Sequence, residues 1–196
     1  NGHRVLDICA APGGKTAQLL AGGAKVTALD ISATRLQTLR QNLERLKLST
    51  EQIICADAVN YLRDFQDEPF DDILLDAPCS ATGTLRRHPE IVHLKTDADI
   101  IKQATLQKQI LQQITKALKV GGRLVYCTCS LDKREGEEQI KSFLKENDNF
   151  SIIPVTIPNC PQEVCTADGF LRVLPCHLSE AGGADGFFIA LLQRIK

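Results

Sequence analysis

The sequence predicts an α/β fold whose sheet is mostly parallel. Three features point to it: apolar, strand-like runs alternate with helical patterns along the 196 residues, a glycine turn follows the first strand, and polar residues end most strands. Strands that alternate with helices pair in parallel, because each helix carries the chain back across the sheet. With 43% hydrophobic and 24% charged residues, the composition is that of one folded, soluble domain.

The individual elements follow from the spacing of apolar residues and from cap and turn signals. Strands are expected at 4–9, 25–30, 52–56, 70–76, 123–128, 150–153 and 187–193. A short helix is expected from Thr16, and a longer one after Ser32, a good N-cap followed by leucines at helical spacing. Further helices are expected at 100–118, ended by Val120-Gly121-Gly122, and at 133–145. The segments from Cys79 to about Asp97 and from Asn159 to Gly169 are expected to be loops.

Charge and cysteine content narrow the class of protein. The net charge of −1 gives no reason to expect a nucleic-acid or membrane surface, and the modest basic segments 1–50 and 79–119 are typical of a solvated face. No apolar run approaches the ~20 residues that cross a bilayer. Eight cysteines are too few for a secreted disulfide scaffold. We therefore expect a protein of the reducing cytoplasm, and, because the chain has no methionine and begins at Asn1, a domain of a longer polypeptide.

The glycine turn after the first strand is a candidate ligand site. At Gly13 and Gly14 the backbone can approach a ligand closely, and the following helix offers free N–H groups. A phosphate-binding P-loop would need glycine where this chain has Cys9, and Pro12 lacks an N–H group. An NTPase loop and a purely structural turn are the alternatives to a cofactor loop.

Two carboxylates follow the next strands. Asp30, sixteen residues after Gly14, can accept hydrogen bonds from both hydroxyls of a ribose, and Asp57 is placed to meet the edge of a base. Each alone is also an ordinary turn residue. Together with the glycine turn they favour a ligand of the adenosine type without a pyrophosphate.

Two cysteines end adjacent strands, in Asp76-Ala77-Pro78-Cys79 and in Thr128-Cys129-Ser130. Their side chains are expected to lie next to each other under one ligand. Such a pair suits methylation of cytosine at C5: a thiolate that adds to C6 turns C5 into a nucleophile, a carboxyl group near N3 stabilises the adduct, and a second group assists release.

Three alternative roles for the cysteines compete with this one. They are buried packing residues, or zinc ligands together with Cys127 and His88, or a redox disulfide. The spacing Cys127-x-Cys129 is unusual for zinc, and the chain has no C-x-x-C motif. Cys127 is expected to share a strand face with Cys129 and to serve packing. Four cysteines have no motif around them and are given no role: Cys55, Cys160, Cys165 and Cys176.

Three stretches together resemble the RNA cytosine-C5 methyltransferases of the Sun/Fmu/NOL1 family. They are L-D-I-C-A-A-P-G-G-K-T at 6–16, D-A-P-C-S-A-T-G-T-L-R-R-H-P-E-I at 76–91 and L-V-Y-C-T-C-S-L at 124–131. The part 80–91 is most similar to the bacterial RsmB branch, which methylates small-subunit ribosomal RNA, and D-G-F-F-I-A at 185–190 also resembles that family. After T-C-S, the usual P-E-E-N run reads Lys133-Arg134-Glu135-Gly136.

The resemblance implies a class I, Rossmann-like methyltransferase fold with an antiparallel C-terminal strand, and S-adenosylmethionine as methyl donor. By matching motifs, Asp30 would hold the ribose, Asp57 the adenine side, and Asp76 would lie between the cofactor and the base. Cys129 would be the nucleophile, and Cys79 would assist release. The turn that would wrap the cofactor consists of Cys9, Ala10, Ala11, Pro12, Gly13, Gly14 and Lys15.

The resemblance also implies how RNA is bound. Residues 1–196 would be the catalytic domain, and a NusB-like RNA-binding domain would precede it. Within the chain, the candidates for phosphate contact are Arg86, Arg87, His88 and Lys95, with a solvated basic turn as the alternative. We expect a monomer that needs no metal and no membrane, acting on small-subunit ribosomal RNA. Transfer RNA as the substrate, or a non-catalytic assembly factor that binds S-adenosylmethionine and RNA, are the alternatives.

Overall fold

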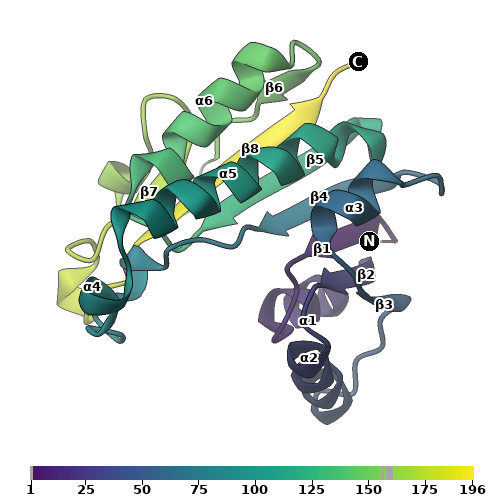
Figure 1. The fold of residues 1–196 in the computed structure, drawn as a ribbon, viewed down its shortest axis with the longest axis horizontal. Coiled ribbons are helices and arrows are strands. Elements are labelled where there is room, and N and C mark those ends of the chain that lie inside the picture. The colour runs from purple at the N-terminus through teal and green to yellow at the C-terminus, as the bar shows by residue number, and fades with distance from the viewer. Residues whose placement is uncertain (1, 156, 158–160) are drawn as a thin grey trace.

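The computed structural model describes residues 2–155, 157 and 161–196, and its centre is an eight-stranded twisted sheet (Figure 1). The strands are β1 (Arg4–Ile8), β2 (Lys25–Asp30), β3 (Gln52–Cys55), β4 (Phe70–Asp76), β5 (Leu118–Thr128), β6 (Phe150–Ile152), β7 (Leu171–Val173) and β8 (Phe187–Arg194). The helices are α1 (Gly14–Ala21), α2 (Ala33–Arg45), α3 (Ala58–Arg63), α4 (Ile91–Leu94), α5 (Asp97–Gln113) and α6 (Glu137–Glu146). Short 3₁₀ turns lie between them.

The order of the strands confirms the predicted fold class. They lie as β3-β2-β1-β4-β5-β8-β6, and β7 pairs with β8 outside this path. From β3 to β5 all neighbours are parallel, whereas β8 runs antiparallel to β5, β6 and β7. Consecutive strands leave β1 in opposite directions, so the carboxyl ends of β1 and β4 border a crevice, where α/β sheets bind ligands.

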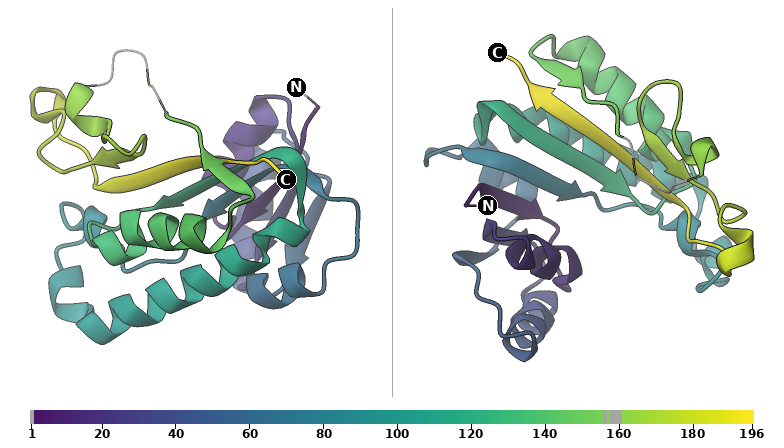
Figure 2. Two further views of the ribbon diagram at one scale, coloured as in Figure 1. Left: turned by 90° about the horizontal axis from the view of Figure 1, so that it is seen from above. Right: turned by 180° about the vertical axis from the view of Figure 1, so that it is seen from behind.

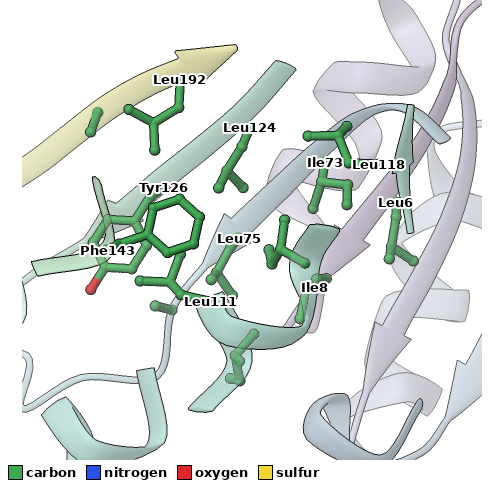
Figure 3. Packing of buried hydrophobic residues seen from close by; sticks show 14 of the residues in the cluster. Leu6, Ile8, Ile73, Leu75, Leu111, Leu118, Leu124, Tyr126, Phe143 and Leu192 are labelled. Carbon is green, nitrogen blue, oxygen red and sulfur yellow. The ribbon is translucent and has the colours of Figure 1, made fainter. Parts of the chain in front are cut away.

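One face of the sheet carries the larger core. Helix α5 runs along this face between α3 and α6 (Figures 1 and 2). Alternate strand side chains point to these helices, among them Leu75, Leu124 and Leu192, and they meet Leu111 of α5 and Phe143 of α6 (Figure 3). Helices α1 and α2 form a second, smaller cluster against β2. Burial alternates along β8 and along β4 from Ile73 onward, so every second side chain of these strands points into a core.

The helix starts follow capping chemistry. The Ser32 hydroxyl accepts a hydrogen bond from the Arg35 N–H and begins α2, as predicted. At α5, Thr96 and Asp99 form a reciprocal capping box, which begins the helix three residues before the expected Ile100. The helix ends at Gln113, five residues before the expected end.

The role predicted for Val120-Gly121-Gly122 is wrong. These residues do not end a helix but belong to β5, which begins at Leu118. The pairing of β4 with β5 shifts register between Phe70 and Asp72, and at this bulge Gly122 lies so close that a Cβ atom would be 2.7 Å from the Asp71 carbonyl oxygen. Glycine is therefore used here for close approach of two strands, not as a helix stop.

Several other boundaries differ from the prediction. Helix α3 and strand β7 were not predicted, and the expected loop before Asp97 contains α4 and a 3₁₀ turn. The expected helix 133–145 is a 3₁₀ turn at Lys133–Glu135 followed by α6, because the chain breaks helical geometry at Gly136. The expected loop 159–169 contains a 3₁₀ turn at Gln162–Val164, and its first residues lie outside the described part.

Candidate active site

The carboxyl ends of the five parallel strands surround a cavity of about 290 Å³. It lies at the crevice between β1 and β4, with Leu106 and Ile110 of α5 forming part of its apolar wall. Six predicted site residues line it: Cys9, Asp30, Asp57, Asp76, Cys79 and Cys129. The other predicted cofactor residues, from Ala10 to Lys15, lie outside its walls. The strand-end pattern of the sequence is thus a real cluster of side chains.

The turn after β1 brings the chain sharply past the cavity. Cys9 and Gly13 both have positive φ, +62° and +100°, a conformation that glycine adopts without strain and cysteine rarely does. Burial raises the pKa of the Cys9 thiol to about 12, so this thiol stays protonated. Gly14 begins α1, and a Cβ atom there would meet nothing within 4 Å. The first turn of α1 is therefore open to a ligand on that side.

Asp30 is buried at the end of β2, with 2% of its surface exposed. Its oxygens accept hydrogen bonds from the N–H groups of Ala11 and Ser32, at 3.1 and 2.9 Å, and Arg35 lies 3.5 Å away. The Arg35 guanidinium also donates to the Ala11 carbonyl. The carboxylate thus joins the glycine turn to the start of α2, and each oxygen keeps a lone pair for a ligand hydroxyl.

Asp57 has two roles at once. Its side chain is the N-cap of α3 and accepts a hydrogen bond from the Asn60 N–H at 2.9 Å, and the residue also lines the cavity. The cap explains why α3 begins directly after β3, although no helix was predicted there.

Asp76 is held from two sides at the end of β4. One oxygen pairs with the Lys15 ammonium at 2.7 Å, and the other accepts a hydrogen bond from the Cys127 thiol at 3.4 Å. Burial opposes the charge on Lys15, but the Asp76 carboxylate outweighs it and raises the pKa of Lys15. Cys127 is buried and lines a separate cavity, so the expectation that it shares a face with Cys129 is wrong: β5 ends at Thr128, and strand alternation no longer places Cys129.

Cys79 and Cys129 lie together, with their sulfur atoms 3.4 Å apart. The hydrogen bond from the Cys79 thiol, opposed by burial, lowers the pKa of Cys129. That same bond and burial raise the pKa of Cys79. The pair is therefore asymmetric: Cys129 ionises first, and Cys79 remains its hydrogen-bond donor. A thiolate is the nucleophilic form of cysteine.

A buried glutamate that sequence reasoning passed over lies beneath the pair. Glu135 is fully buried, and its carboxylate accepts hydrogen bonds from Ser80 and Ser130, the residues that follow the two cysteines. The only sequence signal was its place in the P-E-E-N-like run at 133–136. Two of its donors, Ser80 and Gln107, lie 55 and 28 positions away in the sequence, so no local pattern reveals these contacts.

A glycine junction supports the loop of each cysteine. The Gly83 N–H donates to the Cys129 carbonyl at 2.8 Å, and the Gly186 N–H donates to the Gly83 carbonyl at 2.7 Å. A Cβ atom on Gly83 would overlap the Gly186 carbonyl and lie 2.7 Å from the Cys129 oxygen. The motifs around 76–91 and 185–190 thus meet at Cys129.

We expect Gly83→Ala to lower the free energy of unfolding by about 1–3 kcal/mol, because only backbone atoms could move to admit the methyl group. Denaturant titration measures this. Gly14→Ala is the control, since open space surrounds that position and alanine suits a helix. Equal stability of the two variants would contradict the close packing at Gly83.

The comparisons with known proteins agree with this geometry. The family model described as "16S rRNA methyltransferase RsmB/F" matches residues 1–193. The chain belongs to this family. It is 48% identical over 195 residues to the ribosomal RNA small subunit methyltransferase B of Vibrio cholerae, and 43% identical over 199 residues to that of Pseudomonas putida.

Matches to these relatives cover 98% and 99% of this RsmB/F chain but only 42% and 43% of theirs, so the chain spans less than half of the curated relatives it matches. Among solved structures, NSun6 from Pyrococcus horikoshii, determined with SFG, superposes with a TM-score of 0.81 at 32% identity, covering 99% of this chain and 48% of that one. The methyltransferase homologue from the same organism, at 30% identity, gives 0.77 and covers 98% and 62% of the two chains.

S-adenosylmethionine is the cofactor of this family, and the cavity fits such a group. At about 290 Å³ the cavity is at the small end of the range for small-molecule sites. It combines apolar walls at Leu29 and Ile110 with the buried Asp30 carboxylate, a set that suits a nucleoside with hydroxyl groups.

The four predicted RNA-binding residues are all exposed, but three of them already have partners. Arg87 donates to Asp185 at 2.8 Å, Arg86 to the Gly182 carbonyl at 3.1 Å, and the His88 ring lies 3.1 Å from Glu90. Lys95 follows α4 as its C-cap. Part of the basic charge of this turn is therefore used to attach it to the segment before β8.

The structure also bears on the zinc site and on the cysteines that have no motif around them. Within the described ranges, no group of three or more histidine, cysteine or acidic residues is arranged to hold a metal ion, so the zinc set is not assembled. Cys55, Cys165 and Cys176 are exposed and lie outside the cavity, and Cys160 lies outside the described residues.

The searched part of the chain contains no helix long and apolar enough to cross a membrane.

Proposed function

We propose that residues 1–196 are the catalytic domain of an enzyme that methylates C5 of a cytosine in RNA, with small-subunit ribosomal RNA as substrate. The observation that carries the proposal is the asymmetric thiol pair, 3.4 Å apart, on the wall of the cavity. Membership of the RsmB/F family and the printed names of the relatives support the RNA class. A NusB-like RNA-binding domain preceding this chain is part of the proposal.

The cofactor would be held by the turn 9–15, by Asp30 at the ribose, and by Asp57 near the base. When bound, S-adenosylmethionine supplies an activated methyl group. Asp76, fixed by Lys15 and Cys127, would face the reacting cytosine and stabilise charge at its N3 edge. The target base has to leave its stack, because C6 is shielded within a helix.

Cys129 is the nucleophile in this proposal. Its thiolate forms a bond to C6, and the electron pair of the C5–C6 double bond would then form the new carbon–carbon bond to the donated methyl group, whose bond to the sulfonium sulfur of the donor breaks and leaves a neutral thioether. Loss of the C5 proton re-forms the double bond and expels the Cys129 thiolate. Cys129 is thereby regenerated as a thiolate, so the protein is unchanged at the end of the reaction.

Cys79 assists the release. In the free protein, the negative charge on Cys129 and the shared hydrogen bond keep the Cys79 thiol protonated. Once Cys129 is bonded to carbon that charge is gone, so Cys79 becomes easier to ionise. After its own proton has passed to water, the Cys79 thiolate can accept the C5 proton. The same 3.4 Å contact thus gives the two thiols different roles before and after adduct formation.

The test uses the full-length protein with labelled S-adenosylmethionine and, separately, unmodified small-subunit ribosomal RNA and transfer RNA. The expected result is 5-methylcytosine at one position of the ribosomal RNA. Label in transfer RNA would overturn the substrate class and keep the chemistry. Cofactor binding without label in either RNA would contradict the proposal and favour an assembly factor.

A further inference from the structure

The carboxylate of Glu135 connects the two cysteine loops. Its Oε1 accepts hydrogen bonds from the Ser80 N–H at 2.9 Å and from the Gln107 amide at 3.2 Å. Its Oε2 accepts from the Ser80 and Ser130 hydroxyls, at 2.5 and 2.6 Å. Four donors converge on a side chain with no exposed surface, so both carboxylate oxygens have hydrogen-bond partners although they are buried.

The donors are the residues that determine where the sulfur atoms lie. Ser80 follows Cys79 directly, Ser130 follows Cys129 directly, and the Gln107 amide also donates to the Pro78 carbonyl at 2.9 Å. The two serines are 50 positions apart in the chain. The pairing of β4 with β5 brings the two strand ends together, and the carboxylate adds a tertiary contact that joins the loops beyond those ends.

Other groups hold Glu135 itself in place. Its backbone carbonyl accepts from the Tyr126 hydroxyl at 2.9 Å and the Thr128 hydroxyl at 3.2 Å, and the Arg172 guanidinium donates to the Ser130 carbonyl at 2.6 Å. The pKa of Cys79 is raised mainly by the hydrogen bond with Cys129 and by burial, and the Glu135 carboxylate adds a smaller effect in the same direction.

We propose that Glu135 is the positioning residue of the cysteine pair: its buried carboxylate ties the loop of Cys79 to the loop of Cys129 and so holds the two sulfur atoms in contact. This inference rests on the proposed function only where it concerns the attack of the Cys129 thiolate on RNA. The contacts of Glu135 are present in the protein without RNA or cofactor.

Competitive alkylation of the two thiols tests this. The full-length protein is treated with limiting iodoacetamide across a pH series, without RNA or cofactor, and the label on Cys79 and Cys129 is quantified by peptide mapping. We expect label on Cys129 in the wild type. In Glu135→Gln, the Cys129-to-Cys79 ratio should fall at least about ten-fold, the equivalent of one pKa unit, because loss of the tie between the loops weakens the contact between the sulfur atoms that lowers the pKa of Cys129.

Matched variants separate this role from simple damage to the fold. Glu138→Gln changes an exposed glutamate of α6, three positions along the chain, and should leave the ratio unchanged. Glu135→Asp retains a carboxylate and should keep Cys129 preferred. If Glu135→Gln does not fold, Ser130→Ala removes one arm of the tie and should lower the ratio by a smaller factor. An unchanged ratio in a folded Glu135→Gln protein, or in Ser130→Ala, overturns the inference.

Methyl transfer is measured in parallel to distinguish the two proposals. A shifted labelling ratio in a protein whose wild type never methylates RNA would sustain the role of Glu135 and end the proposed function. Normal methyl transfer by the wild type together with an unshifted ratio in Glu135→Gln would sustain the proposed function and end the role of Glu135.

Discussion

Cys129→Ser is expected to lower methyl transfer at least about 10⁴-fold, because the hydroxyl of serine does not ionise in this environment and no adduct at C6 can form. The change removes one sulfur atom from the wall of the cavity and leaves Asp30, Asp57 and the turn before α1 in place. Cofactor binding, followed as a rise in melting temperature with S-adenosylmethionine, should therefore persist.

The control is Cys176→Ser, which removes an exposed thiol outside the cavity and should leave turnover unchanged. Turnover by Cys129→Ser within about ten-fold of the wild type would show that another group attacks C6.

The rate of methyl transfer by the wild type should increase with pH, because the thiolate of Cys129 is the reactive form. The lowered pKa of Cys129 places this increase below the pH at which a free thiol ionises.

Cys79→Ser is expected to retain adduct formation and to lose release. Cys129 keeps its place through the Gly83 and Glu135 contacts, so its sulfur can still bond to C6. Serine has no group that accepts the C5 proton readily, and the adduct should accumulate as a protein–RNA complex that survives detergent. Gel electrophoresis under denaturing conditions measures it directly.

Two comparisons make this result specific. The double variant Cys79→Ser with Cys129→Ser should give no complex, because the attacking sulfur is gone. Wild-type protein should show a complex only transiently. A Cys79→Ser protein that turns over normally with no trapped RNA would remove Cys79 from the reaction.

Much of the fold could be predicted because local signals and burial agree. Strands β2 and β4 lie at their predicted bounds, and α2 begins at its predicted cap. The position of the site followed from a general property of parallel sheets, whose carboxyl ends meet at one edge. For this reason the sequence alone predicts that the residues at the strand ends form one cluster.

The errors have a common physical origin. Val120-Gly121-Gly122 has the sequence of a helix stop, but the close approach of β4 and β5 decides its conformation. Helix α3 depends on the cap from Asp57, a residue that was predicted only to contact a ligand. Short elements are determined more by their neighbours than by their own residues.

Residues that act through tertiary contacts were the hardest to find. Glu135 lies in a charged segment that is typical of a solvated helix, yet it is fully buried, because donors 28 and 55 positions away in the chain converge on it. Cys127, predicted to serve packing, also holds Asp76. The assigned roles of the site residues, the preceding RNA-binding domain and the monomeric state stay predictions.

The central claim is that one sulfur, that of Cys129, bonds to the RNA. It is tested most directly by digesting the trapped complex of Cys79→Ser to peptides and nucleosides and locating the attached cytidine by fragmentation. Trypsin places Cys127 and Cys129 together on the peptide 124–133, so fragmentation has to distinguish them. We predict cytidine on Cys129. Cytidine on Cys127 or on any other residue would contradict the account.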